Sequence, residues 1–205
     1  MTQHSSAFKK NYEIYLSRIG AVDLPSVAPI LGLVAAGDRF RIDFLGQPYF
    51  VSQAGIQDAS GETPDYITCV ILAKYLILCP DRVVIDESWC AFRDFKKKSH
   101  FLKVNYFASD TENVIVDTFA GRIDTLERFC AQLGGEKKSD GFSYDLVARF
   151  TALPRISLLL LFNEGDDDFG AYGTVLFQKQ AEYYLDPESL AMTSAQLVQQ
   201  LKTLR

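Results

Sequence analysis

The sequence predicts an α+β domain, because segments with helical spacing and segments with hairpin spacing come in blocks rather than in regular alternation. Its 205 residues, of which 48% are hydrophobic, are enough to bury the core of one large domain. The sequence shows no internal repeat and no linker. We therefore expect a single domain over residues 1–205, with an ordered core from residue 7 to residue 204.

The N-terminal part predicts two helices and a hairpin. Aromatic and aliphatic residues recur at helical spacing over Ala7–Ile19, and Gly20 is a typical helix stop. A second, short helix is expected over Val27–Val34. Phe40–Phe44 then alternates as a strand, four turn residues follow, and Tyr49–Val51 returns as the second strand.

A helix over Pro64–Leu78 is expected to lie at the centre of the fold. Its sequence is apolar on nearly every side, which is typical of a helix that is buried on most of its surface. Thr63 is expected to cap its N-terminus, with Pro64 in the first helical position.

The C-terminal half predicts a second hairpin flanked by helices. Ile156–Phe162 is continuously apolar and should be a central strand covered on both faces. Strands on either side of it are expected over Phe142–Thr151 and Tyr172–Phe177. The helices expected in this half are Ser99–Phe107, Glu112–Phe119, Arg122–Leu133 and a last helix that starts at Asp186.

An acidic turn between the last two predicted strands carries four carboxylates in five positions, 164–168. Like charges this close repel one another, so the turn needs a cation, a basic partner or full solvation. In an extended segment Glu164, Asp166 and Asp168 point to one side and could bind Mg²⁺ or Ca²⁺. They do not complete an EF-hand loop, because the twelfth position from Glu164 is Val175. A solvated turn and pairing with arginine are the two alternatives to a metal site.

Trp89, Arg93 and Arg122 are the candidate ligand-binding residues. One helical turn would place Trp89 and Arg93 on the same face, where an indole and a guanidinium can form a stacking wall. Both arginines lie beside aromatic residues and could bind a carboxylate or another anion through paired hydrogen bonds. The alternatives are a core position for Trp89 and structural salt bridges for the arginines.

The sequence lacks the signatures of common catalytic and cofactor sites. Its two histidines, His4 and His100, are too far apart in the chain to suggest a Ser-His-Asp or Cys-His mechanism. It has no haem or nucleotide signature, and its four scattered cysteines match neither a zinc site nor an iron–sulfur cluster. Only Cys90 has a nearby cation, Arg93, that could lower the pKa of a thiol.

The charge and the hydropathy pattern favour a cytoplasmic protein. A net charge of −5 argues against broad nucleic-acid binding. The polar segment Met1–Lys10 does not resemble a secretory signal, and the apolar stretches are too short to span a bilayer. We therefore expect reduced thiols and no membrane association.

A series of short motifs, in a fixed order, gives a family resemblance. The motifs are Trp89-x-x-Phe92-Arg93-Asp94-Phe95, Phe119-Ala120-Gly121-Arg122, Leu133-Gly134-Gly135, Pro154 through the acidic turn to Leu176-Phe177, and Tyr184-Leu185-Asp186. In this order they resemble the family catalogued as domain of unknown function 3786, found mainly in anaerobic bacteria and archaea. The relatives tend to end the acidic turn in Glu-Phe, where this sequence has Asp168-Phe169.

The resemblance implies a family without an assigned activity, so it implies no reaction. Some relatives resemble fusions with an N-terminal iron–sulfur module that is rich in closely spaced cysteines. This sequence has no such cysteines, so electron transfer does not carry over.

Three functions therefore stay open, and the sequence does not decide whether the protein is an enzyme. The first is a non-catalytic binding or accessory module for a small anionic ligand or a partner protein, acting through Trp89, Arg93 and Arg122. The second is a divalent-metal-assisted hydrolase that uses the acidic turn. The third is a structural homo-oligomer.

Overall fold

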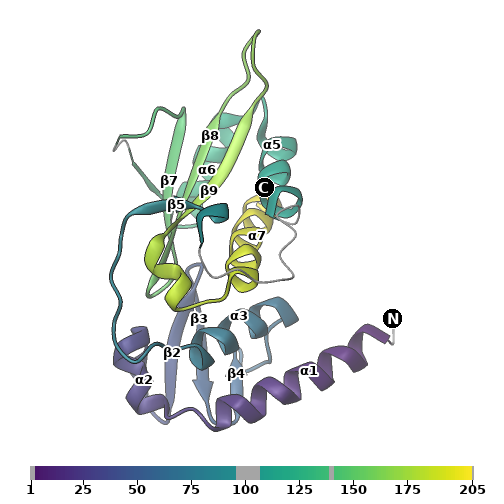
Figure 1. Ribbon diagram of the computed structural model, residues 1–205. Helices are drawn as coiled ribbons and strands as arrows, with labels where there is room; N and C mark the ends of the chain where they lie inside the picture. Colours follow the sequence, from purple (N-terminus) through teal and green to yellow (C-terminus); the bar gives the residue numbers. More distant parts are fainter. Residues whose placement is uncertain (1–2, 96–106, 139–140, 205) are drawn as a thin grey trace.

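Two antiparallel sheets and the helices around them make up the protein (Figure 1). The computed structural model describes residues 3–95, 107–138 and 141–204, with side chains from residue 12 onward. The helices are α1 (Gln3–Gly20), α2 (Leu24–Leu31), α3 (Tyr66–Ile77), α5 (Asn113–Phe119), α6 (Ile123–Gln132) and α7 (Pro187–Thr203), with short helical turns η1 (Phe92–Asp94), η2 (Ala108–Glu112) and η3 (Lys179–Tyr183). The strands are β1 (Val34–Ala36), β2 (Arg39–Phe44), β3 (Gln47–Ser52), β4 (Gly55–Gln57), β5 (Trp89–Ala91), β6 (Glu136–Lys137), β7 (Leu146–Leu153), β8 (Ile156–Asn163) and β9 (Tyr172–Gln178).

The predicted α+β class is confirmed, and so are the two hairpins. The sequence did not predict the short strands β1, β4, β5 and β6, which extend the hairpins into two sheets. The helix expected over Ser99–Phe107 falls outside the described residues, apart from Phe107. No single described helix is long and apolar enough to cross a membrane; the end of α1 and α2 would qualify only as a pair, which is bent by 100°.

Helix α3 is the central helix, as predicted, but its N-cap differs from the prediction. Asp65, not Thr63, caps the helix, because its Oδ1 accepts hydrogen bonds from the N–H groups of Ile67 and Thr68 at 3.0 and 3.1 Å. Most side chains of α3 are buried, which agrees with an apolar sequence on all sides.

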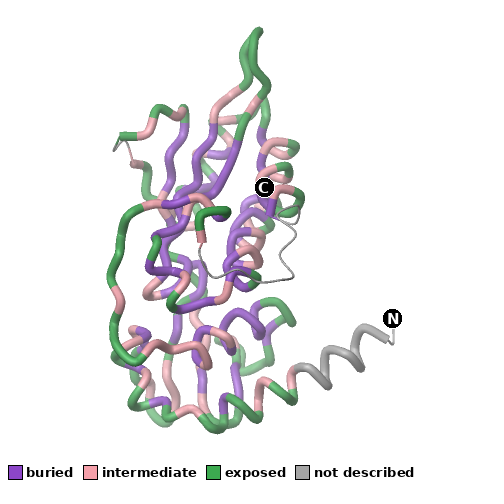
Figure 2. Tube along the Cα trace, in the orientation of Figure 1, coloured by how far each residue is buried: buried purple, intermediate pink, exposed green. Residues whose placement is uncertain are grey.

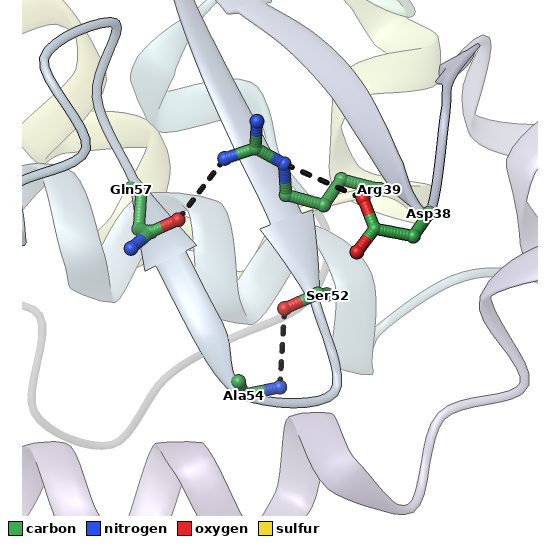
Figure 3. Close-up of polar contacts among 5 residues, drawn as sticks. All are labelled: Asp38, Arg39, Ser52, Ala54 and Gln57. Atoms are coloured by element: carbon green, nitrogen blue, oxygen red, sulfur yellow. Dashed lines mark hydrogen bonds and ion pairs between the residues drawn. The ribbon is translucent and has the colours of Figure 1, made fainter.

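The four-stranded sheet has the order β1-β2-β3-β4. The side chains that it buries in the core are Ile42, Phe44, Val51 and Ile56. Its opposite face carries Arg39, Arg41 and Asp43 of β2, together with Phe50 of β3. Figure 3 shows Arg39 there between two partners: its Nη1 lies 3.1 Å from Oε1 of Gln57, and its Nε lies 3.9 Å from Oδ1 of Asp38. In the β3–β4 turn, Ser52 accepts a hydrogen bond from the N–H of Ala54.

A two-residue turn between β2 and β3 connects the two sheets. Leu45 and Gly46 have φ angles of 48° and 76°, as a type I′ hairpin turn requires. Leucine adopts this conformation rarely, and here the N–H of Leu45 donates a hydrogen bond of 2.9 Å to the carbonyl of Ala152 in β7. The leucine side chain is also buried, which offsets the backbone strain.

The five-stranded sheet has the order β5-β9-β8-β7-β6, with β8 at its centre. Every residue from Ile156 to Phe162 is buried, which accounts for the continuously apolar sequence of β8. Helices α5, α6 and α7 cover one face of this sheet (Figure 1). We call the other face the outer face; among the described elements, no helix lies on it. Its apolar side chains form a separate small cluster: Val147, Leu159 and Leu161, with Trp89, Phe142, Tyr144 and Leu176 packed against them.

The turn between β7 and β8 ties the two halves of the molecule together. The buried hydroxyl of Tyr75 in α3 donates to the carbonyl of Leu31 at 2.8 Å and accepts from the N–H of Arg155 at 3.2 Å. The guanidinium of Arg155 donates to the carbonyls of Ile30 and Pro29, both at 2.9 Å. These carbonyls lie at the C-terminal end of α2, where a positive charge is favourable.

Candidate functional site

The acidic turn lies at the far end of the β8–β9 hairpin, which projects from the body of the protein (Figure 1). Together with the segment that precedes β7, it encloses a groove of about 500 Å³. The residues that line the groove are Ser143, Tyr144, Asp145, Asn163, Glu164, Asp166, Phe169, Gly170 and Tyr172.

Hydrogen bonds to backbone N–H groups fix the floor of this groove. Asn163 Oδ1 accepts from the N–H of Asp145 at 2.9 Å, and Asp145 Oδ2 accepts from the N–H of Glu164 at 2.8 Å. Glu164 Oε1 accepts from the N–H of Gly121 at 2.8 Å. The carboxylate of Glu164 is thus bound by a backbone amide next to Arg122, rather than by the arginine that the sequence suggested.

Asp166 shapes the turn itself. Its Oδ1 accepts hydrogen bonds from the N–H groups of Asp168 and Phe169, at 2.9 and 2.7 Å, and its own N–H donates to the carbonyl of Phe169. The bond from Phe169, followed by that from Asp168, lowers the pKa of the Asp166 carboxyl. The repulsion expected between the carboxylates is therefore relieved by backbone donors and by exposure to water, because Asp166 and Asp168 are both exposed.

The three proposed metal ligands, Glu164, Asp166 and Asp168, do not converge on one point in this structure. Within the described residues, no three His, Cys, Asp or Glu side chains lie close enough together to hold an ion. Glu164 points to the N–H of Gly121, whereas Asp166 faces its own turn. The extended geometry that would align Glu164, Asp166 and Asp168 is absent because the segment is a tight turn.

Aromatic side chains form the exposed part of the groove. The rings of Tyr144 and Tyr172 pack against each other with centroids 6.3 Å apart. Phe169 is 76% exposed and Tyr172 is 48% exposed, although both are large and apolar. Partial burial, with a contribution from Glu112, raises the pKa of Tyr172, so its phenol is protonated at neutral pH.

The base of the hairpin packs closely against α5 and bonds to η2. Gly173 of β9 lies so close to α5 that a Cβ atom there would be 2.7 Å from Cγ2 of Ile115. Farther along, the hydroxyl of Thr174 donates to the carboxylate of Glu112 at 2.6 Å. The strand that carries Tyr172 is therefore packed against the helical layer directly beside the exposed rings.

The helical turn expected to place Trp89 and Arg93 on one face does not form. Trp89 belongs to strand β5 and packs on the outer face, whereas Arg93 lies in the helical turn that follows, exposed to solvent. Arg93 is close enough to Tyr172 to counteract, in part, the rise in the pKa of that phenol. Arg122 precedes α6, and its guanidinium carbon lies 5.9 Å from the ring centre of Phe119. Within the described part of the chain, neither arginine forms an ion pair.

Trp89 instead has two other cations as neighbours. A cavity of about 130 Å³ on the outer face is lined by Trp89, Lys138, Phe142, Val147, Arg149 and Leu159. Lys138 Nζ lies 2.9 Å from a carboxylate oxygen of Glu136, and Arg149 Nη2 donates to Ser157 at 3.2 Å. Both cations already have partners.

Cys90 is not an activated thiol. It is 7% exposed, and burial, assisted by Asp94, raises the pKa of its thiol to about 11. The raised pKa is the opposite of what a nucleophilic cysteine needs.

A comparison with protein-family models finds a match over residues 23–200 to the domain of unknown function DUF3786. The chain belongs to the DUF3786 family. The match covers most of the chain, including both sheets and the groove, so the family resemblance in the sequence is confirmed. Comparisons with curated proteins and with solved structures give no match. The site in this DUF3786 domain therefore has to be judged from its own geometry.

The sequence did not single out the aromatic part of the groove. Tyr144 precedes Phe169 by 25 residues and Tyr172 by 28 residues, and only the pairing of β7 with β8 and of β8 with β9 brings them together. One signal was available in the DUF3786 sequence: Phe169 directly follows three consecutive aspartates and precedes a glycine, a position where an apolar side chain is expected to be exposed.

Proposed function

We propose that this protein is a non-catalytic binding module that holds a basic segment of a partner protein in the groove at the end of β8. The observation that carries the proposal is the exposed aromatic surface of Phe169 and Tyr172 beside fixed carboxylates. Large apolar side chains that are exposed together are a common feature of binding sites.

The chemistry of the groove favours a cationic group. A guanidinium or ammonium group can stack on the exposed face of a tyrosine or phenylalanine ring, and nearby carboxylates add Coulomb attraction. The free carboxylate oxygens come from Asp145, Glu164 and Asp166, each of which keeps one oxygen outside the backbone hydrogen bonds described above. An extended segment with arginine or lysine therefore fits the groove better than an anion.

Binding of a small anionic ligand is the second candidate function. Its site would be the cavity beside Trp89, without Arg93 and Arg122. The cavity beside Trp89 supports it, because an indole and the two cations Lys138 and Arg149 line that cavity. Its volume of about 130 Å³ limits the ligand to a small one. Glu136 and Ser157 compete for the cations, so the groove at the end of β8 has the stronger support.

A titration followed by NMR tests the first proposal. The probe is an oligo-arginine peptide, and an oligo-glutamate peptide of equal length is the control. We expect the arginine peptide to shift the amide signals of Gly170 and Tyr172, with an affinity that falls as salt is added. The glutamate peptide should shift neither signal.

Phe169→Ser should weaken the binding of the arginine peptide several-fold. Ile14→Ser is the matched control, since Ile14 is also exposed, at 54%, but lies on α1. Equal binding by both variants, or peptide-induced shifts confined to another surface, would refute the groove as the binding site.

A further inference from the structure

The segment between α3 and β5 is an extension of the sheet edge. Strand β5 is the outermost strand of the five-stranded sheet. In the residues before β5, every second residue forms backbone hydrogen bonds with the segment that follows β9. Val84 donates its N–H to the hydroxyl of Tyr184 and accepts a hydrogen bond from it, both at 2.9 Å. Asp86 donates to Oε1 of Gln180 at 2.9 Å and accepts from its N–H at 3.2 Å.

This alternation continues into β5. The carbonyl of Ser88 accepts from the N–H of Lys179 at 2.9 Å, and Cys90 pairs with Phe177. The backbone groups of the even-numbered residues from 84 to 90 thus form hydrogen bonds toward the body of the protein. Such alternation is typical of a β-strand that is paired on one side only. The backbone groups of Val83, Ile85 and Glu87 must point to the opposite side. No described residue forms a hydrogen bond with them.

Nothing in the described structure covers this side. The segment runs along the left margin of the molecule in Figure 1, and Figure 2 shows it as mainly exposed. Ile85 is 74% exposed and Val83 is 39% exposed. Residues 83–89 contain no proline and no lysine, the residues that commonly protect a strand edge. The charged residues of this segment are Asp86 and Glu87. A strand edge with exposed aliphatic side chains and no proline is still a template for strand pairing.

We propose that a second copy of this chain pairs with this edge, antiparallel and about a two-fold axis at Ile85. Only outward-pointing residues can form the hydrogen-bonded pairs, so Ile85 faces Ile85 of the second copy, and Val83 faces Glu87 of the second copy. The two isoleucines and the two valines then cover one another on one face of the new strand pair.

The charges of the edge fit this register. Arg82 lies just before the extended segment, and Asp86 lies near its other end. In the antiparallel arrangement Arg82 becomes a diagonal neighbour of Asp86 of the second copy, and the two-fold axis repeats the contact. Parallel pairing would bring the like charges of the two copies together. The antiparallel contact uses the edges of both copies, so the assembly closes at two chains.

The oligomeric state of the full chain, measured by sedimentation equilibrium over a range of concentrations, tests the proposal. Wild type should show a concentration-dependent dimer of twice 23.0 kDa. Ile85→Asp should be monomeric, because two carboxylates would face each other at the axis. Val34→Asp is the matched control: Val34 is 62% exposed, lies on β1, and its substitution should leave the dimer intact.

Two further variants test the hydrogen bonds and the register. Ile85→Pro removes only an outward N–H, so it should abolish the dimer while the far-UV circular dichroism stays that of wild type. Ile85→Cys should form a disulfide-linked dimer on oxidation, because paired Cα atoms about 5.5 Å apart suit a disulfide. A wild-type monomer at every concentration overturns the proposal. So does a dimer that survives Ile85→Asp, or the absence of the cross-link in Ile85→Cys.

Discussion

The two turns that flank strand β8 differ in their contacts with the rest of the protein. At its start, the turn that contains Arg155 lies between the two sheets, and both its backbone and its side chain bind α2 and α3. At its end, the acidic turn projects into solvent, and its hydrogen bonds are mostly local or to the neighbouring segment. The two turns differ in exposure: Pro154 and Arg155 are half-buried, whereas Phe169 and Tyr172 are 76% and 48% exposed.

The difference suggests that the two ends of β8 have different roles, one in stability and the other in recognition. The first turn is bound through the N–H of Arg155 to the buried hydroxyl of Tyr75, so the loss of that hydroxyl leaves unpaired polar groups inside the protein. Changes at the exposed turn cost little folding free energy, because water replaces the lost contacts. We propose that the first end holds the fold together and that the second end binds a partner.

The largest effect on stability should come from Tyr75→Phe. The substitution removes one hydroxyl and leaves the carbonyl of Leu31 and the N–H of Arg155 without that partner. We expect the free energy of unfolding to fall by about 1–3 kcal/mol, as measured by urea denaturation. Tyr172→Phe removes the same hydroxyl at the exposed end and should change stability by less than about 0.5 kcal/mol. Equal losses in the two variants would remove the distinction between the ends.

A smaller effect on stability should come from pH, through an ion pair next to Tyr75. Lys74 of α3 and Asp186, the N-cap of α7, form an ion pair at 2.8 Å with side chains 24% and 31% exposed. Burial raises the pKa of Asp186, but Lys74 and the N–H of Ser189 outweigh it, so the pKa is lowered. Burial lowers the pKa of Lys74, but Asp186 outweighs it and the pKa is raised.

The stabilisation from this pair is therefore complete above the unfolded-state pKa of Asp, about 4, and is lost as the pH falls through the folded-state value. It is also complete below the unfolded-state pKa of Lys, about 10.4, and is lost as the pH rises through the folded-state value. We expect Asp186→Asn to cost about 1 kcal/mol at pH 7 and much less near pH 3, by urea denaturation at both pH values. A cost independent of pH would contradict the assigned ion pair.

At the exposed end, Phe169→Ser should leave the fold unchanged. The side chain is 76% exposed, so its removal creates no cavity. We expect the melting temperature to stay within about 2 °C of the wild-type value, as measured by calorimetry. A large drop would show that Phe169 packs on the protein, and the turn would then be structural.

The smallest effect on the melting temperature should come from added divalent metal ions. Glu164 and Asp166 accept backbone hydrogen bonds, and the described acidic side chains do not gather into a group that could hold an ion. Mg²⁺ and Ca²⁺ should therefore shift the melting temperature of wild type and of Asp168→Asn equally. A rise of several degrees in wild type alone would revive the hydrolase alternative, since a specific ligand stabilises the folded state.

Local sequence patterns predicted the hairpins, the buried α3 and the Asp186 cap, because these depend on spacing and on neighbouring residues. The same patterns placed the α3 cap at Thr63, since Thr-Pro and Asp-Tyr both suit a helix start and only the observed hydrogen bonds of Asp65 distinguish them. The acidic turn was found, but its partner Gly121 was not, because a backbone amide has no sequence signal. The groove depends on strand pairing between residues far apart in the chain, which periodicity cannot supply.

The most direct test of the division along β8 is to measure oligo-arginine affinity and unfolding free energy in Tyr75→Phe and Phe169→Ser, side by side with wild type. We predict that Tyr75→Phe loses stability and keeps the wild-type affinity at temperatures where it is folded. Phe169→Ser should keep the stability and lose affinity. If Tyr75→Phe loses as much affinity as Phe169→Ser, or if neither variant loses any, recognition does not reside at the exposed end of β8.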